Sequence, residues 1–182
     1  MIKLKVVDKE FAETFSKALL SLGVNSTFSF EKDTSHVNRW YVETSNKELF
    51  MFLSRSIDKL IEPAEYYPAE FLRGFFESEG YPIIEAKIRF RVMIGAANSS
   101  LKIINAVRNM LAQLGISSIL RKSHLIGQEV IIRGIKYRSN VDMHTLTVSR
   151  KADVKQFAKL VGLFTNQNKE ASICYSTNGL TC

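Results

Sequence analysis

The chain of 182 residues is 46% hydrophobic and 24% charged, and it carries a formal net charge of +7. These values agree with a compact protein of one domain or two small ones, and the hydrophobic content suffices for a core. Because no apolar run is long enough to span a bilayer and no signal peptide opens the sequence, we expect an intracellular protein, cytoplasmic or organellar, without a membrane partner.

The first part of the chain predicts a strand, a helix and further strands. Apolar and basic side chains alternate over Ile2–Val6, as in a half-buried strand. Residues 9–24 then place apolar side chains at helical spacing and reach Gly23 near their end, which predicts a helix. A β-rich stretch follows, and the next helix is expected to begin near residues 45–47.

The segment at residues 68–80, PAEFLRGFFESEG, predicts a helix with an unusual end. Proline suits a first helical position and glycine suits a left-handed C-terminal cap, so we expect the helix to run from Pro68 to Glu79 and Gly80 to close it. The side that bears Glu79 is small and apolar, so a second helix can approach it closely. That side holds Phe71, Gly74, Phe75 and Ser78. A carboxylate at the bottom of such an interface needs a metal or another partner to neutralise it.

An internal repeat relates the later part of the chain to the first. Residues 101–116 reproduce the helical pattern of residues 9–24 at an offset of 92 residues, and an alternating strand at residues 88–92 precedes them. The next helix of the second copy is expected near residues 149–151, at an offset of 104 residues from its counterpart. The second copy therefore carries about a dozen extra residues between its later strands. Two copies of one unit of helices and strands predict an α+β fold.

The string LRGFFESEG at residues 72–80 resembles the signature of the LAGLIDADG homing endonucleases, which are DNA-cutting enzymes of mobile introns and inteins. Its glycine, small residue, acid and final glycine stand in register with that signature. The resemblance implies that two such helices pack side by side and that Glu79 binds the catalytic metal, with Gly80 close to it. On the motif alone the alternative is an ordinary amphipathic helix with a glycine cap, and the internal repeat favours the family.

The resemblance also implies an architecture of two pseudo-symmetric αββαββα repeats whose antiparallel sheets form a DNA-binding saddle. We assign residues 1–66 to the first repeat and residues 67–182 to the second. A counterpart of Glu79 in the first copy would fall before Met1, so we expect the first repeat to lack its N-terminal helix. A deletion, a start codon assigned too late, a naturally split enzyme and a degenerate protein are the open explanations. With that helix we expect a pseudo-dimeric monomer, and without it a chain that either self-associates through residues 68–79 or is poorly behaved and inactive.

Basic residues concentrate in the second copy. Residues 1–82 hold 10 Lys and Arg against 13 Asp and Glu, whereas residues 83–182 hold 15 against 5. A segment this positive favours binding to a polyphosphate, and a merely soluble basic surface is the alternative. Arg and Lys can read guanine, and Gln and Asn can read adenine, in the major groove. The candidate DNA-contacting residues, each of which has an ordinary exposed side chain as its alternative, are Lys3, Lys5, Lys32, Asn38, Arg39, Tyr41, Lys87, Arg89, Arg91, Arg121, Lys122, His124, Gln128, Arg133, Lys136, Tyr137, Arg138 and Asn140.

The function implied by the resemblance is Mg²⁺-dependent, site-specific cleavage of double-stranded DNA, with a staggered cut that leaves short 3′ overhangs. Mg²⁺ held between Glu79 and a second acid would activate water and stabilise the leaving oxygen. Lys169 resembles in place the basic residue that the family keeps beside the metals. Two alternatives keep the same fold: a maturase that binds intron RNA, and a sequence-specific DNA-binding protein that does not cleave.

Overall fold

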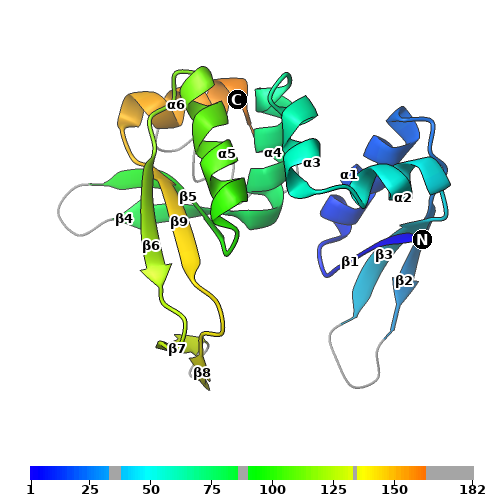
Figure 1. Cartoon of the computed structure of the whole chain (residues 1–182), viewed down its shortest axis with the longest axis horizontal. Coiled ribbons are helices and arrows are strands. Elements are labelled where there is room, and N and C mark those ends of the chain that lie inside the picture. The colour runs from blue at the N-terminus through cyan, green and yellow to red at the C-terminus, as the bar shows by residue number, and fades with distance from the viewer. Residues whose placement is uncertain (33–37, 86–89, 133–134, 163–182) are drawn as a thin grey trace. The chain divides into compact units, whose positions relative to one another are not determined.

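The structure is a computed structural model that describes residues 1–32, 38–85, 90–132 and 135–162 (Figure 1). The chain divides into two compact units, unit 1 over Met1–Leu60 and unit 2 over Ile61–Cys182. Each unit combines helices with an antiparallel sheet, so the predicted α+β class is confirmed. No helix in the described ranges is long and apolar enough to cross a bilayer. The division into sequence repeats at residues 66 and 67 stays a prediction.

Unit 1 packs its helices on one face of a three-stranded sheet. β1 (Ile2–Val6) and β2 (Thr27–Glu31) flank β3 (Arg39–Thr44). α1 (Lys9–Ser21) begins after Asp8, whose Oδ1 accepts a hydrogen bond from the Phe11 N–H at 3.1 Å. α2 (Lys47–Leu53) and α3 (Ile57–Ala64) follow the sheet, and the last residues of α3 belong to unit 2. The buried core of unit 1 consists of Ala12, Leu19, Val24 and Val42, with Val6, Phe15, Phe28, Trp40 and Leu49 packed against it.

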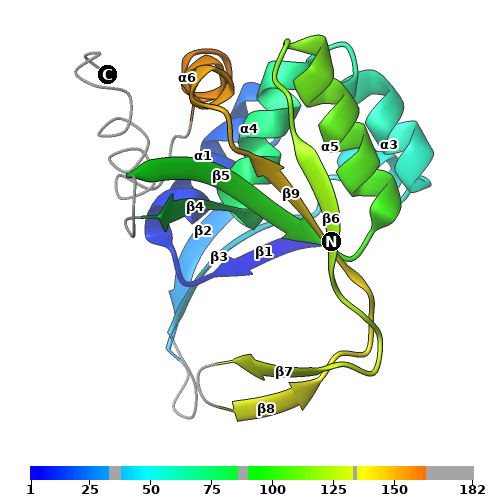
Figure 2. The ribbon, with the colours of Figure 1, turned by 90° about the vertical axis from the view of Figure 1, so that its left-hand side faces the viewer.

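In unit 2 the helix predicted at residues 68–79, α4 (Pro68–Glu79), follows the end of α3, and it lies with further helices on one side of a four-stranded sheet (Figure 2). The sheet runs in the order β4-β5-β9-β6, with β4 (Gly80–Glu85), β5 (Arg91–Asn98), β6 (Ile119–His124) and β9 (Met143–Val148). The other helices are α5 (Leu101–Gln113) and α6 (Lys151–Leu160). A separate two-stranded ribbon consists of β7 (Glu129–Ile132) and β8 (Ile135–Arg138).

The core of unit 2 lies between the helices and the sheet. Its fully buried side chains include Leu72, Phe76, Val107, Met110, Leu111, Leu146 and Phe157. The rings of Phe76 and Phe157 meet edge to face with centroids 4.8 Å apart, so α4 and α6 are joined over the sheet. This packing fixes α4 against the rest of the unit and therefore fixes the position of its C-terminal end.

The internal repeat predicted from the sequence is present in the structure. α1 and β2 begin 92 residues before α5 and β6, and β3 and α2 begin 104 residues before β9 and α6. Strand pairing repeats as well, because Ile2 lies opposite Thr44 as Ile94 lies opposite Val148. The extra residues of the second copy form the β7–β8 ribbon. Within residues 1–32 and 38–60, no element corresponds to α4 or β4.

The strand predicted at residues 88–92 differs from the one observed. β5 begins at Arg91, and residues 86–89 lie outside the described part of the chain. The alternating basic pattern located only the start of the strand. From Val92 to Ala96, β5 continues as a run of buried residues. The alternation therefore does not extend into this buried run.

Candidate functional site

The C-terminal end of α4 presents an exposed carboxylate on a firmly packed helix. Leu72 and Phe76 are buried on one side of α4, whereas Glu79 at its last position is exposed. The C-terminal end of a helix carries partial negative charge, and α4 has no basic residue in its last turn. A carboxylate there is electrostatically unfavourable, so helix stability does not account for Glu79. A cation bound at this end would remove the disadvantage.

Gly80 adopts a conformation that differs from the left-handed cap predicted for it. Its φ is −84° and its ψ is 152°, which is extended backbone, and β4 starts at this residue. The chain thus passes from helix to strand without a loop. A Cβ built on Gly80 would lie 2.3 Å from the carbonyl oxygen of Phe76 and 2.9 Å from its Cα. Glycine is required here for close approach and not for a positive φ.

The side of α4 predicted as a helix interface is only partly exposed. Gly74 and Ser78 are exposed, and Phe71 is half-buried. Phe75, predicted on the same side, is only 9% exposed and its ring packs edge to face with Phe76, so its place in a helix interface stays a prediction. The burial of Phe75 has a geometric reason, since positions three and four after Leu72 share its face of the helix. The Ser78 hydroxyl donates to the Phe75 carbonyl at 3.0 Å and leaves a surface of small side chains.

Tyr81 lies directly after this acid–glycine pair and was missed by sequence reasoning. It lies opposite Gly95 across the β4–β5 pair. A Cβ on Gly95 would come within 2.7 Å of the Tyr81 ring, so the glycine provides the space that the ring occupies on the sheet. Tyr81 remains 39% exposed. The signal that could have found it is a glycine inside a strand, which often marks a close approach.

The sheet of unit 1 gathers four of the predicted DNA-contacting residues on the face that α1 does not cover. Strand pairing places these residues side by side: Lys3, Lys5, Arg39 and Tyr41. They alternate with half-buried residues of β1 and with half-buried and buried residues of β3. Two further predicted residues, Lys32 and Asn38, are exposed just beyond β2 and just before β3. The predicted grouping in unit 1 therefore has a structural counterpart, although contact with DNA stays a prediction.

Two carboxylates share this face and were not anticipated. Lys3 Nζ lies 3.0 Å from Glu43 Oε2, and Lys5 Nζ lies 2.6 Å from Glu31 Oε2. The hydrogen bond to Glu43 raises the pKa of Lys3, which therefore stays charged at neutral pH. Lys3 Nζ also lies 4.0 Å from the centre of the Tyr41 ring. Ion pairs this exposed contribute little to stability. The face thus combines donors and acceptors with a small net charge.

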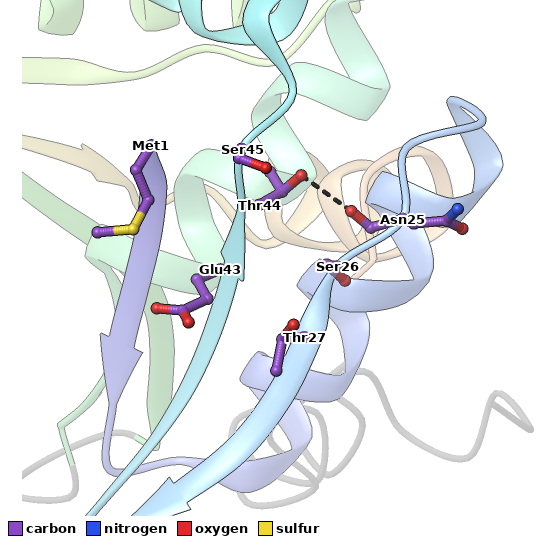
Figure 3. A pocket seen from close by; sticks show the side chains of 7 residues that line it. All are labelled: Met1, Asn25, Ser26, Thr27, Glu43, Thr44 and Ser45. Atoms are coloured by element: carbon purple, nitrogen blue, oxygen red, sulfur yellow. Dashed lines mark hydrogen bonds between the residues drawn. The ribbon is translucent and has the colours of Figure 1, made fainter.

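A small polar hollow lies at the end of this sheet (Figure 3). Its volume is about 280 Å³, and Met1, Asn25, Ser26, Thr27, Glu43, Thr44 and Ser45 line it. The Thr44 hydroxyl donates to the Asn25 carbonyl at 2.8 Å and is thereby occupied. The Glu43 carboxylate in the lining is paired with Lys3. The volume of the hollow lies just below the range of about 300–1,000 Å³ that is typical of ligand pockets.

In unit 2, predicted DNA-contacting residues line β6 and the turn after it, and they differ in what they contact. Arg121 is exposed and lies opposite Thr145, on the sheet face away from the helices. Lys122 Nζ lies 2.7 Å from Asp142 Oδ2. The hydrogen bonds from Lys122 and then from the Ile126 N–H lower the pKa of Asp142. Gln128 is also engaged, since its Oε1 accepts from the Leu125 N–H at 3.0 Å. Lys122 and Gln128 therefore brace the base of the ribbon.

The β7–β8 ribbon carries further predicted residues. Lys136 and Arg138 share one face of the ribbon with Glu129 and Ile131, while Tyr137 lies on the other. Lys136, Tyr137 and Arg138 are exposed. Among the other predicted residues, Arg91, His124 and Asn140 are exposed too. Lys87, Arg89, Arg133 and Lys169 lie outside the described residues.

The Glu79 carboxylate is a suitable ligand for a metal ion whose other ligands come from a bound substrate. Mg²⁺ prefers oxygen ligands and is usually held by one or two carboxylates together with substrate phosphates and water. Within residues 1–32, 38–85, 90–132 and 135–162, no group of three or more His, Cys, Asp or Glu side chains could hold a metal. Glu79 therefore fits a metal that a phosphate helps to bind, and it does not fit a closed structural metal site.

Comparison of the sequence with known families and proteins identifies relatives of this chain. A family model described as LAGLIDADG-like domain matches residues 67–162. An uncharacterized protein of Methanocaldococcus jannaschii, MJ0398, is 35% identical over 168 residues, which make up 92% of this chain and 59% of that protein. The chain therefore spans less than two thirds of the length of this relative.

Solved structures show the same fold at low sequence identity. The homing endonuclease I-DmoI in complex with DNA and Mn has a TM-score of 0.58 at 13% identity, over 88% of this chain and 80% of that one. Other I-DmoI complexes with DNA contain Ca or were crystallised in the presence of Mg. The N-terminal LAGLIDADG domain of DUF199/WhiA has a TM-score of 0.51 at 15% identity, over 90% of this chain and 73% of that one. At these identities the likeness concerns the fold alone.

Proposed function

The chain belongs to the LAGLIDADG-like domain family, and on this basis we propose that it is a site-specific endonuclease that makes a staggered cut in double-stranded DNA. The observation that carries the proposal is the exposed Glu79 at the negative end of α4, where stability alone does not favour a carboxylate. Its place before Gly80 is the place of the acid in the family signature.

Glu79 is the residue we propose as metal ligand, with Mg²⁺ as the metal. When bound, the ion would activate a water and stabilise the leaving oxygen of a phosphodiester. The fold would hold the Glu79 carboxylate in a fixed position. Phe76 anchors α4 by packing against Phe157 of α6, and Gly80 connects α4 directly to β4. A second acid and Lys169 belong to the same proposal.

Binding of the duplex is proposed to use the sheet faces away from the helices. In unit 1 that face carries Lys3, Lys5 and Arg39, and in unit 2 it carries Arg121. The separate β7–β8 ribbon adds the exposed residues Lys136 and Arg138. A two-stranded ribbon fits the major groove, where base edges can be read. Lysine and arginine at these positions would also neutralise phosphates, so binding should weaken with salt.

A second candidate function is sequence-specific binding of DNA without cleavage, or of intron RNA by a maturase. The observation that favours it is the single signature acid in the described part of the chain, where α4 has no counterpart in unit 1. The same sheet faces would serve either role. A comparison of binding and cleavage on the same nucleic acid separates these functions.

The test compares the wild type with Glu79→Gln, which removes the charge and keeps the shape. A duplex selected from a random pool by gel shift is incubated with each protein in Mg²⁺. We expect the wild type to cut both strands and Glu79→Gln to bind with similar affinity without cutting. Glu70→Gln is the matched control, because Glu70 is an exposed glutamate in the first turn of the same helix. Undiminished cutting by Glu79→Gln would refute the assignment of Glu79 as a metal ligand.

A further inference from the structure

The uncovered face of the unit 1 sheet holds an ordered set of opposite charges. Strand pairing places Lys3 opposite Glu43, and Glu31 opposite Arg39. The lysines of β1 reach across to form two ion pairs, Lys3–Glu43 at 3.0 Å and Lys5–Glu31 at 2.6 Å. Each pair thus presents a hydrogen-bond donor and an acceptor side by side on an accessible surface.

The repeated fold does not require these charges. The positions 92 residues after Lys3 and Lys5 are Gly95 and Ala97, and the position 92 residues after Glu31 is Ser123. The position 104 residues after Glu43 is Thr147. The same sheet is therefore built in unit 2 with uncharged residues at all four positions. The two pairs are a property of the unit 1 surface and not of its architecture.

Phosphate binding does not explain the pairs either. Glu31 and Glu43 offset the attraction of Lys3 and Lys5 for a polyanion, since each carboxylate lies within hydrogen-bonding distance of a lysine. A surface that bound only the phosphate backbone of DNA would need the lysines and would bind more weakly with the two glutamates present. The retained acceptors point instead to a ligand that offers hydrogen-bond donors as well as acceptors.

The major-groove edge of a G·C pair has this pattern. Guanine presents N7 and O6 as acceptors, which lysine can meet, and cytosine presents its N4 amino group as a donor, which glutamate can accept. O6 and N4 of one pair are joined by a Watson–Crick hydrogen bond and so lie about 2.7–3.2 Å apart. The lysine nitrogen and glutamate oxygen of each ion pair are separated by a similar distance, 3.0 and 2.6 Å.

The spacing of the two pairs also suits a duplex. Lys3 and Lys5 are two residues apart on one strand, a separation of about 6.6–6.8 Å. Two base-pair steps of B-DNA cover about 6.8 Å. Lys5 lies opposite Tyr41, whereas Glu31 lies opposite Arg39, two residues away on β3. The second ion pair is therefore displaced somewhat further along the sheet. A strand lying along the groove would bring the two pairs to base pairs two or three steps apart.

We propose, on the basis of the duplex binding proposed above, that Lys3–Glu43 and Lys5–Glu31 are specificity-determining pairs that each read one G·C base pair. The DNA half-site under unit 1 then contains two G·C pairs that lie two or three steps apart. The proposal concerns recognition alone and holds whether or not the chain cleaves what it binds.

The experiment selects bound duplexes from a random pool without divalent cations and sequences them. For the wild type we expect two strongly preferred G·C positions two or three steps apart. Glu43→Gln and Lys3→Met should both relax the preference at one and the same position, and Glu31→Gln at the other, by roughly five- to 150-fold. Glutamine can read adenine, so Glu43→Gln and Glu31→Gln should shift the preference toward A·T.

Glu13→Gln is the matched control, because Glu13 forms an ion pair of similar length with Lys9, 3.1 Å, on α1 and not on the sheet. Circular dichroism checks that each variant is folded. If the wild type selects a sequence and the variants of Lys3, Glu31 and Glu43 select the same one, the pairs do not read bases and the proposal is overturned, while DNA binding stands. If the wild type selects no sequence, the proposed function and the reading of G·C pairs both fail.

Discussion

Gly80→Ala is the most direct perturbation of the site, because the methyl group that it adds would clash with the backbone of Phe76. The added Cβ would lie 2.3 Å from the Phe76 carbonyl oxygen and 2.9 Å from Phe76 Cα. Both atoms belong to the backbone of α4, so relief requires the backbone at the junction of α4 and β4 to shift, and overpacking of this kind costs about 1–3 kcal/mol. For a unit of this size we expect the melting temperature to fall by about 5–15 °C.

The same helix supplies the control for this substitution. Outside the backbone of its own helix, a Cβ added to Gly74 would meet no atom within 4 Å, so Gly74→Ala adds an identical group at a place with room for it. Its expected effect is a gain of up to about 1 kcal/mol, because alanine favours a helix interior more than glycine does. Denaturation in urea and by heat measures both variants.

The same variants test the link between geometry and chemistry. Gly80→Ala is expected to lose DNA cleavage at temperatures where circular dichroism shows it folded, since it displaces Glu79. A Gly80→Ala protein as stable and as active as the wild type would refute the close-approach role of this glycine. Loss of stability in Gly74→Ala would show that a second helix packs on the Gly74 side of α4.

Further outcomes follow from charge. Arg91→Ala removes an exposed cation at the start of β5, and it should lower the slope of log affinity against log salt by about one if Arg91 contacts a phosphate; an unchanged slope would exclude that contact. The pKa of Asp142 lies below the ordinary aspartate value of about 3.9, so the stabilisation from its bonds to Lys122 and the Ile126 N–H is complete above that value and is lost as the pH falls through the lower pKa. The protection of the Ile126 amide, taken as the intrinsic exchange rate relative to the observed rate at the same pH, should therefore fall in acid, and Asp142→Asn should remove most of this pH dependence; protection with the same acid dependence in both proteins would contradict it.

Local sequence signals were sufficient for the helices and for the repeat. Apolar spacing and the terminal glycines located α1 and α5, and Gly23 and Gly115 both adopt a positive φ, 71° and 72°, in the structure. The predicted start of α4 at Pro68 and its end at Glu79 were also correct. These features depend on neighbours in the chain, which a sequence shows directly.

Features that depend on contacts across the fold could not be read in the same way. The extended conformation of Gly80 follows from its distance to Phe76 and from its place at the start of β4. The pairing of Lys5 with Glu31 depends on the register of β1 and β2 against β3, which no local pattern specifies. Tyr81 opposite Gly95 depends on the register of β4 and β5. In each case two segments had to be aligned before the residues could be seen together.

Cleavage mapped on separately end-labelled strands tests the central claim, an endonuclease acting through Glu79, most directly. A duplex selected by the wild-type protein is incubated with it in Mg²⁺, and the products are resolved on a sequencing gel beside those of Glu79→Gln. The account predicts one defined break in each strand, staggered between the strands, with breaks absent for Glu79→Gln despite equal binding. A duplex that the wild type binds specifically and leaves intact in Mg²⁺, Mn²⁺ and Ca²⁺ would contradict the account and would leave DNA binding as the function.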